Sequence, residues 1–135
     1  MRIFFVITLV CICSTGCVNQ PISRKTIDKT VYAKIAMLCP DIRSKVVNIY
    51  YFDGDCSICI SKAMDLENEF RGNAMEKVLY IATTQNEYAA RFNIENIGIK
   101  SCYIISDSAE YNSFFSLNTI TKIDKNLKII EERKY

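Results

Sequence analysis

The sequence predicts an α/β fold, in which helices cover both faces of a central sheet. An apolar run rich in β-branched and aromatic residues, at positions 46–52, is followed directly by a segment with helical periodicity at 57–70. Strands and helices then continue to alternate as far as a C-terminal hairpin. The chain has 135 residues, enough for one such domain.

The first predicted element is a short helix over residues 26–38. Its apolar side chains recur at helical spacing, and Pro40 ends it because proline cannot continue a helix. We expect this helix to cover the core.

The next two elements are a buried strand and the helix that follows it. Residues 46–52 (VVNIYYF) are apolar almost throughout, which is typical of a central strand, and we expect Tyr50, Tyr51 and Phe52 to pack in the core. The helix over 57–70 places Cys59, Ala63, Leu66 and Phe70 on one side. Gly72 then provides a stop.

The second half of the chain contributes shorter elements. We expect strands at 78–83 and 102–106, with a short helix at 87–92 between them. Asp107 and Glu110 have the spacing of a capping box, which predicts another short helix ending near Phe115. Residues 119–124 and 127–131 form the hairpin, with its turn at 125–126.

The N-terminus has the pattern of a secretory signal. A positive start is followed by an apolar run at 3–12, too short to span a bilayer as a mature helix, and then by Ser14-Thr15-Gly16-Cys17. The last four resemble a lipobox, although Ser14 departs from the usual leucine. We therefore expect a lipoprotein signal peptide at 1–16, a lipid-anchored tether and short helix at 17–44, and a domain at 45–135.

Lipidation of Cys17 would hold the protein on the extracytoplasmic, periplasmic side of a bacterial membrane. The alternatives are a plain signal peptide or an uncleaved anchor, with Cys17 incidental.

Composition excludes several classes of function. The net charge is only +2 and no segment is strongly basic, so nothing predicts nucleic-acid binding. The chain has no histidine, which removes Cys–His and Ser–His pairs and the commonest metal ligand. No glycine-rich phosphate loop is present either. We expect no cofactor and no metal.

Cys56-Ser57-Ile58-Cys59 lies where the first strand gives way to its helix. At a helix N-terminus, free backbone N–H groups stabilise a thiolate, and the pKa of a cysteine there commonly falls below about 8.5. Cys56 is therefore the expected nucleophile and Cys59, one turn later, the resolving thiol. Asp53 and Asp55 oppose thiolate formation by their charge.

Other interpretations of the cysteines remain open. Cys56 and Cys59 could form a structural disulfide, pack as inert thiols, or join Cys39 and Cys102 in a four-thiolate zinc site. Cys102 is expected as a buried core thiol. Cys39, beside Pro40, could be exposed, and it could pair with Cys102 or with a partner.

Two blocks of sequence resemble the thioredoxin superfamily, specifically its anchored TlpA-type oxidoreductases and redoxins. They are VVNIYYFDGDCSIC at 46–59 and LNTITKIDKNLKII at 117–130. The resemblance implies a thioredoxin-like sheet over about 45–131 and a catalytic pair, Cys56 and Cys59. It also implies a substrate-facing position at Asn118, where the family carries a cis-proline; we expect a trans peptide there. The chain leaves no room for the family's final helix.

The predicted function is a membrane-anchored thiol–disulfide oxidoreductase. It would exchange dithiol and disulfide with protein substrates through Cys56 and be reset by a redox partner. The alternative is a non-catalytic lipoprotein whose degenerate thioredoxin-like domain serves as a binding module, an interpretation that Asn118 favours.

Overall fold

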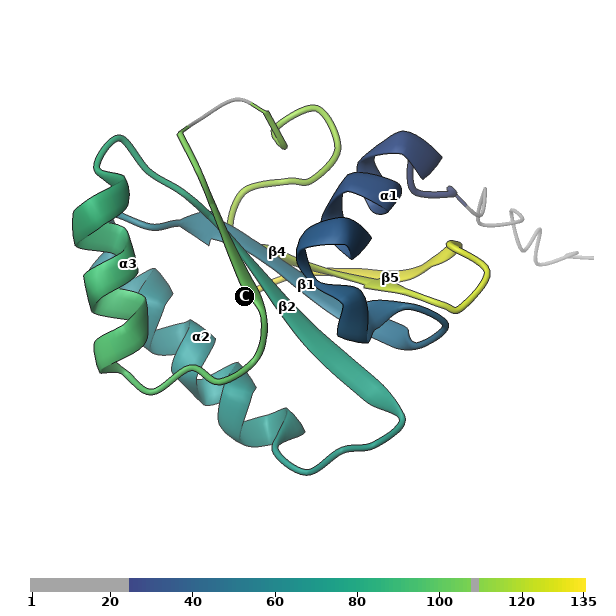
Figure 1. Ribbon diagram of the computed structural model, residues 1–135, viewed down its shortest axis with the longest axis horizontal. Coiled ribbons are helices and arrows are strands. Elements are labelled where there is room, and N and C mark those ends of the chain that lie inside the picture. Colours follow the sequence, from purple (N-terminus) through teal and green to yellow (C-terminus); the bar gives the residue numbers. More distant parts are fainter. Residues whose placement is uncertain (1–24, 108–109) are drawn as a thin grey trace, which may run out of the picture.

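The computed structural model describes residues 25–107 and 110–135. In that part of the chain, five strands form one mixed sheet in the order β3-β2-β1-β4-β5 (Figure 1). The strands are β1 (Val46–Asp53), β2 (Glu76–Thr83), β3 (Tyr103–Ser106), β4 (Thr119–Ile123) and β5 (Ile129–Lys134). β1, β2 and β3 run parallel, whereas β4 is antiparallel to both β1 and β5.

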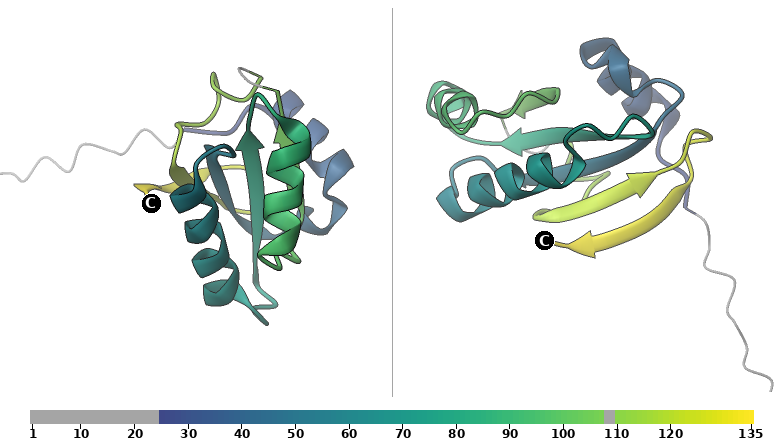
Figure 2. Two further views of the ribbon diagram at one scale, coloured as in Figure 1. Left: turned by 90° about the vertical axis from the view of Figure 1, so that its left-hand side faces the viewer. Right: turned by 90° about the horizontal axis from the view of Figure 1, so that it is seen from below.

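The helices lie on both faces of the sheet, as predicted. Helices α2 (Ser57–Phe70) and α3 (Glu87–Asn96) cover one face and α1 (Lys29–Leu38) covers the other (Figure 2). The links β1–α2–β2 and β2–α3–β3 step across the sheet in the same direction. Because such links are right-handed, both helices fall on one side.

Two layers of buried side chains fill the space between helices and sheet. Successive residues of β1 alternate between them: Tyr51 points toward α1, while Tyr50 and Phe52 point toward α2. All three side chains are fully buried, which confirms the core role expected for them.

Local sequence signals placed most elements correctly. Helix α2 begins and ends at the predicted residues, and β1 extends the predicted strand by one residue. Helix α1 begins at Lys29 rather than at Thr26, because the carboxylate of Asp28 caps it by accepting from the N–H groups of Thr30 and Val31. Thr26 instead bridges to Lys128 beside β5. Helix α3 continues to Asn96, one turn beyond the prediction, and this turn buries Ile94.

The helix predicted from Asp107 and Glu110 to Phe115 is wrong. Residues 110–115 form turns, in which the N–H groups of Phe114 and Phe115 both donate to the carbonyl of Tyr111. Tyr111 and Phe115 are buried against the α1 side of the sheet, and Glu110 pairs with Lys34 of α1. Tertiary packing of these two aromatic rings therefore overrides the local capping signal.

The hairpin is present and longer than predicted, because β5 pairs with β4 as far as Lys134. Its turn is stabilised by Asp124, whose carboxylate accepts from the N–H groups of Asn126 and Lys128. None of the helices in the described ranges is long and apolar enough to cross a membrane.

Candidate functional site

Cys56 and Cys59 lie at the carboxyl end of β1 and are joined in a disulfide, with their Cα atoms 5.2 Å apart. Cys56 is the N-cap of α2, and its Sγ accepts a hydrogen bond from the N–H of Cys59 at 3.3 Å. Cys56 is partly exposed, whereas Cys59 is only 7% exposed. The two sulfurs thus differ in access: solvent reaches Cys56 first.

The loop before Cys56 is held tightly against the end of β2. The N–H of Gly54 donates to the carbonyl of Thr83 at 2.7 Å, and that of Cys56 donates to the carbonyl of Asp53 at 3.2 Å. A Cβ at position 54 would lie 3.2 Å from the Cβ of Ala82 and from the Thr83 carbonyl oxygen. Glycine is the residue that permits this close approach.

The carboxylates of Asp53 and Asp55 are engaged within the loops. Asp53 accepts from the N–H of Asp55 at 2.9 Å. Asp55 accepts from the hydroxyl of Thr84 and, at 3.2 Å, from the N–H of Gln85. Asp55 therefore ties the loop before Cys56 to the connection between β2 and α3, a role that the sequence did not reveal.

Asn118 lies beside this loop, immediately before β4. Its backbone is left-handed, with φ of 55°, and the described residues contain no cis peptide bond. Its side-chain oxygen accepts from the N–H of Asp53 at 3.4 Å, and its carbonyl accepts from the N–H of Tyr135 at 3.1 Å. Asn118 thus connects the loop of the cysteine pair to the last residue of the chain; a substrate-facing role stays a prediction.

Tyr50 of β1 packs between the sheet and α2. Its hydroxyl donates to the carbonyl of Cys59 at 3.4 Å, and its ring stacks on Phe52 with centroids 4.7 Å apart. Burial, and to a smaller extent the proximity of Tyr135, raise the pKa of Tyr50 to about 12. Tyr50 is therefore a neutral packing residue behind the disulfide.

The other two described cysteines form a second disulfide, Cys39–Cys102. This is the pairing left open for Cys39 in the sequence. The expectation of a buried Cys102 is wrong: Cys102 is partly exposed, and it is Cys39 that is buried, with 1% exposed. The four thiols are paired in two separate disulfides, so the zinc site that would have combined them is not formed. Cys17 lies outside the described residues.

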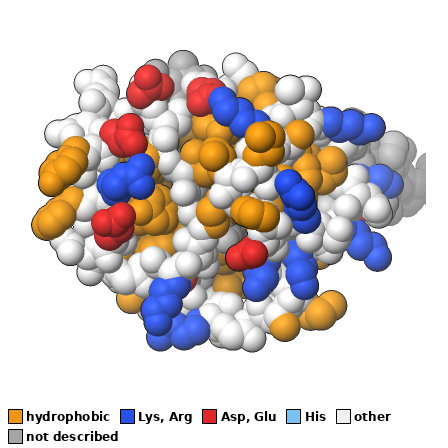
Figure 3. Space-filling model, viewed as in Figure 1, with side chains coloured by type: hydrophobic (Ala, Val, Ile, Leu, Met, Phe, Trp, Pro, Cys, Tyr) orange, Lys and Arg blue, Asp and Glu red, His pale blue; other side chains and the backbone are white. Residues whose placement is uncertain are grey.

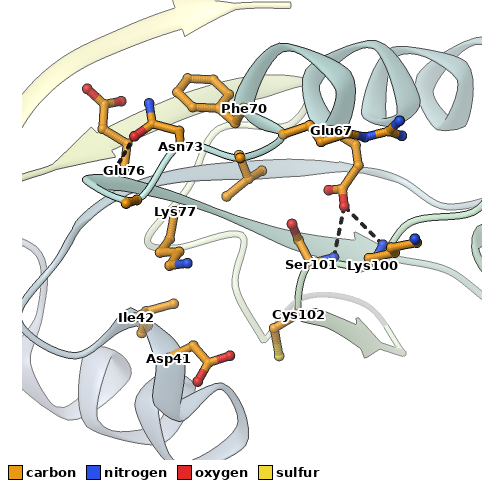
Figure 4. A pocket seen from close by; sticks show the side chains of 14 residues that line it. Asp41, Ile42, Glu67, Phe70, Asn73, Glu76, Lys77, Lys100, Ser101 and Cys102 are labelled. Atoms are coloured by element: carbon orange, nitrogen blue, oxygen red, sulfur yellow. Dashed lines mark hydrogen bonds between the residues drawn. The ribbon is translucent and has the colours of Figure 1, made fainter.

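A cavity of about 520 Å³ lies away from the cysteine pair, between the end of α2, the start of β2 and the loop before β3 (Figure 4). Glu67 reaches into this region and accepts from the N–H groups of Lys100 and Ser101, both at 3.0 Å, and from the hydroxyl of Tyr80 at 2.9 Å. Burial alone would raise the pKa of Glu67, but these hydrogen bonds lower it below its ordinary value. Glu67 fastens the 100–101 loop to α2. Cys102 also lines the cavity, which gives solvent a route to the second disulfide.

No protein-family model matches the chain, and no curated protein matches it. Solved structures do match. The thioredoxin domain of a thiol-disulfide oxidoreductase from Bacteroides vulgatus superposes with a TM-score of 0.58 at 17% identity, over 70% of this chain and 73% of that chain.

Two further solved structures are similar. The exposed lipoprotein thioredoxin of Streptococcus pneumoniae gives a TM-score of 0.52 at 19% identity, over 71% of this chain and 78% of that one. A protein from Chlorobium tepidum, proposed to be the thiol:disulfide interchange protein DsbE, gives 0.58 at 12% identity, over 70% and 71% of the two chains. At these identities the similarity establishes the fold, and the predicted thioredoxin-like architecture is confirmed.

Proposed function

We propose that this protein is a membrane-anchored thiol–disulfide oxidoreductase that acts on protein substrates outside the cytoplasm. The observation that carries the proposal is the asymmetry of the cysteine pair. Cys56 lies at the N-cap of α2 and is partly exposed, whereas Cys59 is buried one turn behind it at disulfide distance. In such an arrangement the exposed sulfur of Cys56 can bond to the substrate, and the buried sulfur of Cys59 can then displace the substrate from it.

The exchange runs in two steps. In the reduced protein, the Cys56 thiolate attacks one sulfur of a substrate disulfide, and the other substrate sulfur leaves as a thiolate. Cys59 then loses its proton to solvent and attacks the Cys56 sulfur, so that the remaining substrate sulfur leaves and the Cys56–Cys59 disulfide closes. Two electrons pass to the substrate; the reverse sequence oxidises a substrate dithiol.

The N-terminus of α2 supports the first of these steps. The N–H of Cys59 already donates to Cys56 Sγ, and the free N–H groups and dipole of the helix favour negative charge at its start. No histidine is available as a base, and the pair has no need of one when the nucleophile is already a thiolate.

Attachment through lipidated Cys17 completes the proposal. Its support is the signal-like N-terminal sequence together with the fold shared with the lipoprotein thioredoxin of Streptococcus pneumoniae. The partner that resets the pair would be a second dithiol protein or a small thiol at the same membrane face.

The test is a titration of the Cys56–Cys59 pair against glutathione in the full chain, with Cys56→Ser as control. A reversible two-electron couple that the control lacks would support exchange chemistry, and its potential would distinguish a reductant from an oxidant. A pair that forms no reversible disulfide would overturn the proposal.

One observation favours a second candidate, a non-catalytic binding module. Asn118, left-handed and trans, occupies the position at which the resemblance led us to expect a cis-proline. If the pair is redox-inert while the domain still captures a protein from the same membrane, this candidate replaces the oxidoreductase.

A further inference from the structure

We propose that the end of the domain opposite the cysteine pair binds the surface of an anionic membrane. This inference rests on the membrane attachment proposed above, but not on redox activity. The surface is a shallow hollow of about 470 Å³ whose lining includes Tyr32, Met37, Arg43, Lys125 and Leu127. We call it the basic hollow.

The basic hollow combines cationic and apolar side chains. Arg43 and Lys125 are exposed, neither takes part in an ion pair within the described residues, and no acidic residue lines the hollow. Met37 is 76% exposed on α1, beside Leu38 at 57%. Cations for lipid phosphates together with apolar side chains for the interface are what a membrane-binding surface requires.

Further basic residues surround the hollow. Lys29 lies two turns before Met37 on the same stripe of α1, at positions 29, 33 and 37. Lys25 and Lys128 lie where the N-terminal segment runs beside the start of β5, because Thr26 bridges to Lys128 and the N–H of Ile129 donates to the carbonyl of Lys25. Figure 3 shows Lys and Arg side chains gathered over α1 on the right of the view, whereas Asp and Glu lie mostly on the left.

Two acidic residues near the hollow are engaged in backbone hydrogen bonds, whereas Asp41, two positions before Arg43, is exposed. Asp28 caps α1, and Asp124 accepts from the N–H groups of Asn126 and Lys128 in the hairpin turn. Both carboxylates are therefore already hydrogen-bonded to the backbone, whereas Arg43 and Lys125 are exposed to solvent.

The position of the N-terminal segment indicates that the basic hollow binds the membrane rather than another ligand. The described chain begins at Lys25, whose carbonyl accepts from the N–H of Ile129 at 2.8 Å, two residues from Leu127 of the hollow. Cys17 lies eight residues earlier, so the covalent link between them spans at most about 28 Å. A lipid on Cys17 would thus keep this end of the domain close to the headgroups.

Binding through the basic hollow would also orient the cysteine pair. Arg43 precedes β1, and the hairpin turn lies at the same end of that strand, because Ile123 pairs with Val47. Cys56 follows the other end of β1, an eight-residue strand about 23 Å long. The disulfide would face away from the membrane, toward soluble substrates.

The chain contains no tryptophan, which permits a single-site reporter. Full-length Met37→Trp protein is reconstituted into vesicles of phosphatidylcholine alone, or of phosphatidylcholine with phosphatidylglycerol, each with and without brominated lipid. The matched reporter is Tyr88→Trp, a residue 84% exposed on α3. We expect a blue shift and bromine quenching of Trp emission only for Met37→Trp, only with phosphatidylglycerol, and lost in 1 M salt, where charges are screened beyond about 3 Å.

Two charge reversals in the Met37→Trp background test the electrostatic part. Lys125→Glu lies in the hairpin turn, and Lys134→Glu lies at the far end of β5, opposite Thr119. Both substitutions change the net charge equally, but only Lys125 lines the basic hollow. Only Lys125→Glu should therefore abolish the quenching.

The failures are distinguishable. Protein that floats with the vesicles but shows no quenching at position 37 would overturn the basic hollow and leave the anchor standing. Protein that does not float with either vesicle would overturn both. Equal effects of the two charge reversals would show attraction by net charge alone and would also overturn the proposal.

Discussion

Cys39, at the end of α1, is joined by a disulfide to Cys102, the residue before β3, across 63 positions of the chain. The bond fastens α1 to the sheet at the edge opposite the hairpin. Its two sulfurs are unequal, since Cys39 is buried and Cys102 borders the cavity near Glu67.

The first prediction concerns this bond. Replacing both Cys39 and Cys102 by serine should lower the free energy of unfolding by about 2–4 kcal/mol, because the crosslink restricts the unfolded chain. Urea denaturation of the oxidised proteins measures the difference. A variant with Cys56 and Cys59 both changed to serine is the control, because the disulfide that it removes closes a far shorter loop. An equal loss in the two variants would contradict the argument.

The second prediction concerns access to the two cysteine pairs. In the fully reduced protein, iodoacetamide should label Cys56 before Cys59 and Cys102 before Cys39, since the first of each pair is the more exposed. Site-resolved mass spectrometry measures the four rates. In concentrated urea the contrast between exposed and buried cysteines should largely disappear; if Cys59 reacts first in the folded protein, the assignment of the nucleophile is wrong.

The third prediction concerns Asn118. Asn118→Ala should destabilise the fold by about 1–2 kcal/mol, because alanine tolerates the left-handed backbone less well and cannot accept from the N–H of Asp53. Asn118→Gly should cost less, since glycine adopts this backbone freely.

Proline at the same position should cost the most, because its ring fixes φ near −65° and the native φ is 55°. Thermal unfolding ranks the three variants. A stabilised or more active Asn118→Pro variant would mean that this loop rearranges to the backbone expected from the family.

The fourth prediction concerns Glu67 and pH. The pKa of Glu67 is lowered in the folded protein, so its carboxylate stabilises the fold fully above the unfolded value of about 4.3. This contribution is lost as pH falls through the lower, folded pKa. Glu67→Gln should therefore be less stable than the native protein at pH 7, and the gap should narrow in acid.

Denaturant midpoints between pH 7 and pH 3 measure the difference in stability between Glu67→Gln and the native protein. Glu69→Gln, an exposed neighbour on α2, serves as the matched control and should show a small, nearly constant difference in stability. A Glu67→Gln gap that does not change with pH would show that the hydrogen bonds to Lys100 and Ser101 do not depend on the charge.

The sequence by itself determined the order of strands and helices, because local patterns encode them. The apolar run at 46–52 and the spacing of Cys59, Ala63 and Leu66 predicted β1 and α2 almost to the residue, and with them the position of Cys56 at a helix start. These features depend on neighbours within one or two turns of chain.

Only the tertiary structure decided the long-range features. The pairing of Cys39 with Cys102, the contact of Asp55 with Thr84 and the bonds from Asn118 to Asp53 and Tyr135 each join residues from distant parts of the sequence. The turns at 110–115, where a helix was predicted, belong to the same class, because burial of Tyr111 and Phe115 outweighs a local capping signal. Such contacts depend on how distant segments pack across the sheet, and the periodicity of side chains along the chain does not predict them.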